Sequence, residues 1–161
     1  FEYVKGYRDL GNGIYIVPHT ATDTILQRAR RTHMCAETDN GVGLDSFAHE
    51  QTVVFEEDDG LVCVNSCSHA GADVIMEEVR SAFPGKRIKA FFGGFHLMGL
   101  RGVKTCAYSK DEVCRLAQRL LETEETVYYS GHCTGIIAFA WLKELMGRRL
   151  EAMSSGKVFE V

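Results

Sequence analysis

The stretch "LVCVNSCSHAGADVIMEEVR", residues 61–80, joins the two local patterns that decide the fold. Residues 61–64 are apolar and partly β-branched, which predicts a buried strand, and after Gly71 the apolar residues recur at helical spacing. A single histidine, His69, lies between the two patterns. The stretch therefore predicts a strand that ends near a histidine and turns at once into a helix.

The same alternation continues on both sides of this stretch. Residues 51–66 predict a β-hairpin, because two β-rich runs flank a turn signal at residues 58–60. We expect further strands at 87–95 and 126–131, helices at 71–83, 110–124 and 135–147, and a closing hairpin around Gly156. This order predicts an α/β fold, in which ligand sites gather at the carboxyl ends of strands.

The amino-terminal third is less regular. Residues 12–17 predict a strand that Pro18 closes. Residues 19–50 show no sustained period, so we expect a long functional or mobile loop with a short helix around Asp23–Arg31. Three histidines fall in this segment, and we expect them to take loop or surface positions. They are His19, His33 and His49.

Composition narrows the class of protein. The chain has 161 residues, 45% hydrophobic and 25% charged, which predicts one globular domain over residues 1–161. With a net charge of −4 and no basic stripe, it is not expected to bind nucleic acid. The basic cluster from Arg28 to Arg31 is typical of a solvated loop or helix face, with a phosphate or carboxylate site as the alternative.

Two further features concern the cellular compartment. No apolar stretch reaches about 18 residues, so no membrane span is expected. The six cysteines include no C-x-x-C pair, and several fall inside predicted strands or helices, as buried free thiols do. We therefore predict a reducing, cytoplasmic location.

Three of the six histidines share one setting. His69, His96 and His132 each follow the end of a predicted strand, with glycines beside them. If the three strands are neighbours in the sheet, the three imidazoles converge on one edge. Convergent neutral imidazoles are the ligands of catalytic zinc or iron sites, where the metal activates a water molecule. A lone histidine in this setting would more often be a locally hydrogen-bonded residue at the strand end.

A cysteine nucleophile is the alternative chemistry. Cys67 precedes His69 by two residues and shares its face on an extended strand, while Cys133 adjoins His132. Cysteine–histidine catalysis needs spatial pairing and a third, orienting group, and neighbours in sequence rarely face each other. The metal interpretation is the stronger one.

Three ordered motifs, "SCSHAGADVI" (66–75), "FFGGFHLMG" (91–99) and "SGHCTG" (130–135), resemble the metallo-β-lactamase-fold hydrolases. The branch they resemble is the 7,8-dihydropterin-6-methyl-4-(β-ribofuranosyl)aminobenzene-5'-phosphate synthase-like one. The resemblance implies an αββα sandwich, of which this chain is the carboxyl-terminal half plus the preceding hairpin. It implies a metal-dependent hydrolase, or a transferase of the same fold, that acts on a small phosphorylated or pterin-like substrate.

The resemblance also implies a metal site. Two ions are expected, usually zinc, with iron or manganese as alternatives. His69 and His132 match the third and fifth metal motifs, and His96 falls near the fourth, where many relatives have a bridging Asp. A neutral imidazole has one lone pair and cannot bridge two metals. His96 is therefore expected to bind one metal or to face the substrate.

The main metal motif of that family, H-x-H-x-D-H, is absent from these residues. We therefore expect an incomplete domain that alone binds metal weakly or not at all. An uncovered sheet face would favour a homo-oligomer or association with the missing amino-terminal half. The alternative function is a non-catalytic, truncated half-domain that serves as a binding or assembly unit.

Overall fold

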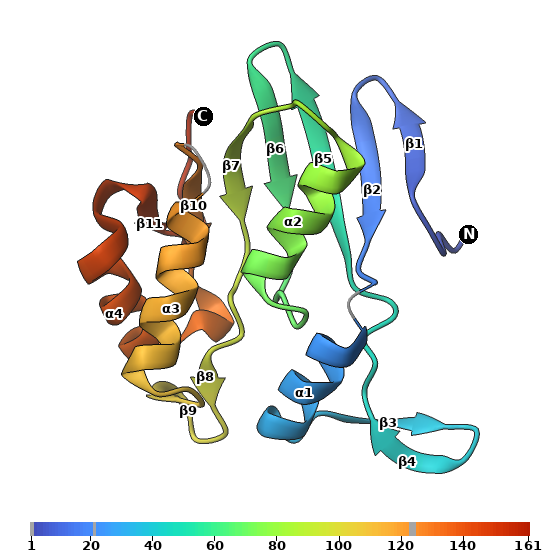
Figure 1. The fold of residues 1–161 in the computed structure, drawn as a ribbon, viewed down its shortest axis with the longest axis vertical. Coiled ribbons are helices and arrows are strands. Elements are labelled where there is room, and N and C mark those ends of the chain that lie inside the picture. The colour runs from blue at the N-terminus through green and yellow to red at the C-terminus, as the bar shows by residue number, and fades with distance from the viewer. Residues whose placement is uncertain (1, 21, 123–124) are drawn as a thin grey trace.

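The computed structural model describes residues 2–20, 22–122 and 125–161. Its centre is a seven-stranded mixed sheet in the order β1-β2-β5-β6-β7-β10-β11 (Figure 1). The strands are β1 (Arg8–Gly11), β2 (Ile14–Pro18), β5 (Gln51–Glu57), β6 (Gly60–Val64), β7 (Ile88–Phe92), β10 (Val127–Ser130) and β11 (Leu150–Ala152). Strands from β1 to β6 pair antiparallel, and those from β6 to β11 pair parallel. The chain therefore has the α/β class that the sequence predicts.

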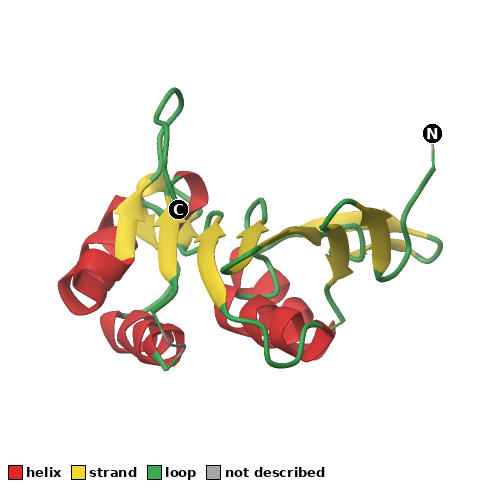
Figure 2. Ribbon diagram, turned by 90° about the horizontal axis from the view of Figure 1, so that it is seen from above, coloured by secondary structure: helices red, strands yellow, loops and turns green. Residues whose placement is uncertain are grey.

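Most of the helical segments lie on one side of this sheet (Figure 2). The helices are α1 (Thr22–Thr32), α2 (Ala72–Ala82), α3 (Lys110–Leu121) and α4 (Ile136–Met146), with short 3-10 turns η1 (His132–Thr134) and η2 (Gly147–Arg149). Helix α3 begins with a capping box in which Ser109 and Glu112 bond to each other's backbone N–H groups. The buried residues of α2, α3 and α4 pack against β6, β7 and β10 to form the main core.

A smaller apolar cluster covers the opposite face of the sheet. Tyr129 stacks on Phe92 with ring centroids 4.4 Å apart, and Phe159 of the carboxyl-terminal segment packs edge-on against Tyr129 at 4.6 Å. Val62 and Ala90 are buried beside them. This second face is thus apolar, and the last residues of the chain cover only part of it.

The prediction of a closing hairpin around Gly156 is wrong. Residues 150–152 form β11, which pairs parallel with β10, and residues 157–161 form no strand. The reason is the intervening helix α4, because a strand that returns after a helix on the sheet face runs parallel to the strand before it. The apolar tail then packs on the sheet face through Phe159 and does not pair as a strand.

The segment 19–50 is more ordered than expected. It contains α1, which confirms the short helix, and a hairpin of β3 (Cys35–Thr38) and β4 (Gly41–Leu44) that the sequence did not indicate. Most of that hairpin is exposed or half-buried, so it has no alternating apolar face to reveal it. A second small hairpin, β8 (Met98–Gly99) with β9 (Gly102–Cys106), was missed for the same reason. Within the described residues, none of the helices has both the length and the apolar character needed to cross a membrane.

Candidate metal centre

Three parallel strands form the scaffold of the site. Strand β7 pairs directly with both β6 and β10. The strands before His69, His96 and His132 are therefore neighbours, as their predicted convergence on one edge requires. All three histidines follow the carboxyl ends of these strands and so lie along one edge of the sheet. That edge is where the crossover loops of a parallel sheet place ligand-binding groups.

The ring of His69 is held in one orientation. Its Nδ1 lies 2.9 Å from Oε1 of Glu50, and its backbone N–H donates to Oε2 of the same carboxylate at 2.8 Å. The ring also stacks on Phe47, with centroids 3.8 Å apart and planes 10° apart. A carboxylate on one ring nitrogen is the usual support of a metal-binding histidine, and it leaves Nε2 available to bind a metal.

The surroundings of Glu50 favour its ionised form. Burial alone would raise its pKa, but the hydrogen bond from His69 and then the charges of His69 and His19 leave the pKa of Glu50 below its ordinary value. The side chain is only 2% exposed, so His69 contacts a buried negative charge. This carboxylate is a candidate site residue that the sequence did not indicate.

His96 is the neighbour of His69, with ring centroids 4.4 Å apart. Both of its ring nitrogens are buried and have no hydrogen-bond partner within the described parts of the chain. Burial, followed by the charge of His69, lowers the pKa of His96 to about 4, so the imidazole is neutral near pH 7. A buried polar atom without a partner costs about 1–3 kcal/mol, and a metal ion bonded to His96 would remove that cost for one of its two ring nitrogens. The pair His69–His96 thus fits a metal ion.

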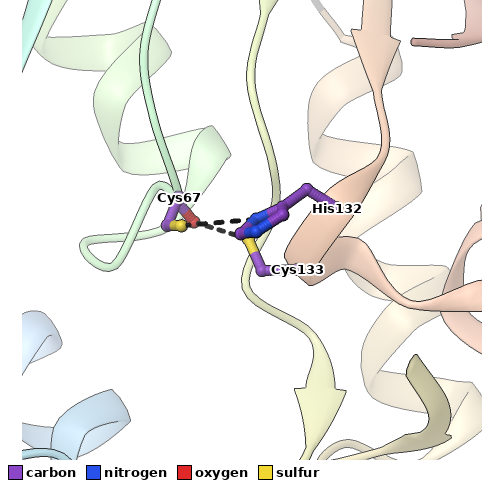
Figure 3. Close-up of side chains that lie close together, drawn as sticks. All are labelled: Cys67, His132 and Cys133. Atoms are coloured by element: carbon purple, nitrogen blue, oxygen red, sulfur yellow. Dashed lines mark hydrogen bonds between the residues drawn. The ribbon is translucent and has the colours of Figure 1, made fainter. Parts of the chain in front are cut away.

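His132 lies with two cysteines instead. Its Nδ1 is 3.8 Å from Cys67 Sγ, and the donor atoms of Cys67, His132 and Cys133 all lie within 4.8 Å of one another (Figure 3). A hydrogen bond from Cys133, opposed in part by burial, lowers the pKa of Cys67 to about 6, and the same contact raises the pKa of Cys133. The sequence-predicted histidines therefore fall into two groups along one edge.

His19 lies in a loop, which agrees with the loop position expected for it, but it is buried and so does not take a surface position. It is 8% exposed, and its ring bonds to Glu78 at 2.8 Å and to Asn65 at 2.9 Å. The cause is its place directly after β2, which turns it inward over α2. His33 and His49 are exposed, as expected.

A basic pocket of about 300 Å³ adjoins the edge, between α1 and α3. The guanidinium of Arg31 lies 4.6 Å from the Tyr108 ring centroid and pairs with Glu112. Nη1 of Arg28 and the hydroxyl of Tyr108 are buried without a hydrogen-bond partner among the described residues. Leu97, next to His96, also lines the pocket, and the charge of Arg28 contributes to the low pKa of His96. The pocket is thus electrostatically connected to the histidine pair.

Comparison with known proteins identifies the fold. No protein-family model matches the chain, and no curated protein matches it. Among solved structures it is similar to the crystal structure of Tm1679, described as a metal-dependent hydrolase of the beta-lactamase superfamily, with a TM-score of 0.76 and 24% sequence identity. The match covers 98% of this chain and 57% of the Tm1679 chain. This chain therefore has the mixed α/β fold of that structure and spans a little over half its length.

Proposed function

We propose that the chain is part of a metal-dependent hydrolase, or of a transferase of the same fold, that acts on a small anionic substrate. The observation that carries the proposal is the pair His69–His96. One imidazole is held by a buried carboxylate, and the other has two unpartnered ring nitrogens. The fold shared with Tm1679 supports it, because that protein is a metal-dependent hydrolase of the beta-lactamase superfamily.

The chain's own residues have distinct roles in this proposal. His69 and His96 hold a metal through imidazole nitrogens, and His132 provides a third imidazole along the edge. A bound ion would supply Lewis acidity, which polarises a substrate oxygen or a water molecule. Glu50 is a positioning residue, because its carboxylate fixes the ring of His69 and increases its basicity.

The charge of the basic pocket indicates the class of substrate. Four arginines line it, Arg28, Arg31, Arg115 and Arg119. Arg31 pairs with Glu112, and Arg28 and Arg119 both approach Asp73, so four positive charges face two negative ones. An excess of two positive charges fits a phosphate or carboxylate group. We propose that this pocket holds the anionic group of a small, phosphorylated substrate while the histidine edge contacts its reacting part.

We propose that the remaining metal ligands of the site come from residues outside this chain. The family resemblance assigns further ligands to an H-x-H-x-D-H motif that these residues lack, and assigns two ions, with zinc preferred over iron or manganese. The domain would then be an incomplete metallo-β-lactamase-like domain. Its second sheet face, around Tyr129 and Phe92, is the surface by which it would associate with a missing half or a second copy.

The histidine pair is tested by a zinc titration followed by NMR of the imidazole nitrogens, with resonances assigned from His69→Ala and His96→Ala. We expect the resonances of His69 and His96 to shift and those of the exposed His33 and His49 to stay in place. Unchanged resonances of His69 and His96 at saturating zinc would contradict the proposal. Hydrolysis of phosphate esters by the complete protein, lost with a chelator, tests the reaction itself.

A further inference from the structure

We propose that Cys67, His132 and Cys133 form a second metal subsite, with two sulfur ligands and one nitrogen ligand, for a thiophilic ion such as zinc. The inference deepens the proposed function and rests on it for the metal-dependent role of this sheet edge. It changes the ligand assignment, because two thiolates join His132 in a site distinct from the pair His69–His96. It also places three donors of one ion within this chain.

The distances between the donor atoms are those of a nearly formed site. Zinc bonds to sulfur at about 2.3 Å and to nitrogen at about 2.0–2.1 Å, so tetrahedral ligand atoms are about 3.5–3.8 Å apart. Cys67 Sγ and His132 Nδ1 are already 3.8 Å apart, and all three donors lie within 4.8 Å of one another. Ion binding would require the donor atoms to close by at most about 1.3 Å.

The backbone explains how two consecutive residues face the same ligand. Successive residues of an extended chain point to opposite sides, but His132 has a φ of 47°, in the left-handed region. The turn is held by hydrogen bonds from the N–H of Thr134 to the carbonyl of Gly131 at 3.0 Å and from the N–H of Leu97 to the carbonyl of Cys133 at 3.0 Å. His132 and Cys133 are therefore both presented to Cys67 (Figure 3).

Strand β7 lies between the strands that carry these residues, and its end makes room for them. A Cβ at Gly94 would lie 2.4 Å from Cys133 Sγ and 3.4 Å from the carbonyl oxygen of Ser66. A glycine is therefore required for the cysteine sulfur to occupy this position beside the β6 loop. Cys133 is buried, Cys67 is half-buried and His132 is exposed, so the subsite has a packed floor and an open side.

A buried cysteine most often packs as a small apolar residue, and this explanation accounts for Cys133 alone. It does not account for a second sulfur and an imidazole nitrogen that lie within 4.8 Å of the Cys133 sulfur. Thiolate ligands favour zinc over magnesium, calcium and manganese. Three protein ligands and one open position are also the arrangement of catalytic zinc sites. The histidines alone predict weak metal binding by this chain, whereas this subsite predicts binding of one zinc ion.

The test is a titration of the full chain with Co²⁺, a spectroscopic substitute for zinc, under reducing, anaerobic conditions. We expect a sulfur-to-cobalt charge-transfer absorption that saturates at one ion per chain and disappears when Zn²⁺ is added. Cys67→Ser and Cys133→Ser should each remove most of this absorption and weaken binding at least about 100-fold, because loss of a ligand exceeds the 10–100-fold effect of its supporting partners. The exposed Cys35→Ser is the matched control and should behave like the unchanged chain.

Two results would overturn the inference. Cobalt that binds without the sulfur band, or with a band that survives both serine substitutions, would show that the cysteines are not ligands. Absence of binding would do the same, because the subsite lies wholly within this chain. Either result would leave the proposed function intact, since that function rests on His69 and His96. A sulfur band together with unchanged His69 and His96 resonances in zinc would support the inference and contradict the proposed metal pair. Circular dichroism of each variant verifies that it is folded.

Discussion

The two halves of the sheet edge differ in chemistry. At one end, His69 and His96 form a half-buried imidazole pair, in which Glu50 orients the ring of His69. At the other, His132 and Cys133 of the 3-10 turn η1 lie close to Cys67 of the loop between β6 and α2, and His132 is exposed. The two groups therefore differ in how many further metal ligands the rest of the protein must supply. The imidazole pair supplies two ligands and needs others to complete it, whereas the sulfur-containing group supplies three.

The largest expected effect is a loss of hydrolytic activity when the imidazole pair is removed, with the sulfur-containing group left intact. The double variant His69→Ala, His96→Ala should lower hydrolysis by the complete protein more than about 100-fold, because loss of ligands exceeds the 10–100-fold cost of losing their supporting residues. The sulfur-to-cobalt absorption should persist in that variant. Steady-state kinetics and the cobalt spectrum are the measurements. If activity survived, the imidazole pair would not be the reaction site.

A smaller effect is expected from Glu50→Gln. The amide keeps the shape of the side chain but removes the charge that supports His69, so metal affinity at the imidazole pair should fall about 10–100-fold. The sulfur-containing group should be unaffected. Zinc titration by calorimetry measures both, with the exposed Glu77→Gln as the control. Equal losses at the two groups would mean that they are one site.

The substitution Gly94→Ala tests the sulfur-containing group at the other end of the sheet edge. The added Cβ would collide with Cys133 Sγ, so the cost in unfolding free energy should be about 1–3 kcal/mol, which is typical of overpacking in a core. Cobalt binding through sulfur should weaken, while the His69 and His96 resonances should still respond to zinc. Thermal unfolding and the cobalt spectrum give the two readouts. The half-buried Gly6→Ala, where an added Cβ would meet nothing within 4 Å, is the control.

The smallest effect concerns the basic pocket next to the imidazole pair. Arg28→Gln should weaken binding of inorganic phosphate several-fold, since a charge-assisted hydrogen bond is worth about 1.5–3 kcal/mol before competition from water and salt. Glu112→Gln should strengthen it slightly, because Arg31 then has no carboxylate partner. Calorimetry at low ionic strength measures both. An unchanged affinity in both variants would exclude the pocket as the anion site.

Much of the fold could be predicted because its signals are local. The β5–β6 hairpin and helices α2, α3 and α4 have clear apolar periods and turn residues. The tail at 157–161 misled because "KVFEV" has the composition of a strand, while its place on the sheet face depends on Phe92 and Tyr129. Exposed hairpins such as β3–β4 have no apolar face to predict them from.

The candidate site was predicted where it follows from topology and missed where it depends on long-range contacts. His69, His96 and His132 each follow the end of a predicted strand, and this position predicted that they lie along one edge of the sheet. The contact of Glu50 with His69 spans 19 residues, and that of Cys67 with His132 spans 65. No local pattern encodes either contact. The double glycine after β7 was the one available signal that two loops approach each other there.

The most direct measurement is a crystal structure of the zinc-loaded chain with anomalous scattering recorded at the zinc absorption edge. We expect one peak at about 2.3 Å from the sulfurs of Cys67 and Cys133, bonded also to His132, and a second, weaker peak beside the ring nitrogens of His69 and His96. Zinc bound elsewhere on the chain, with no peak at either group, would contradict the account.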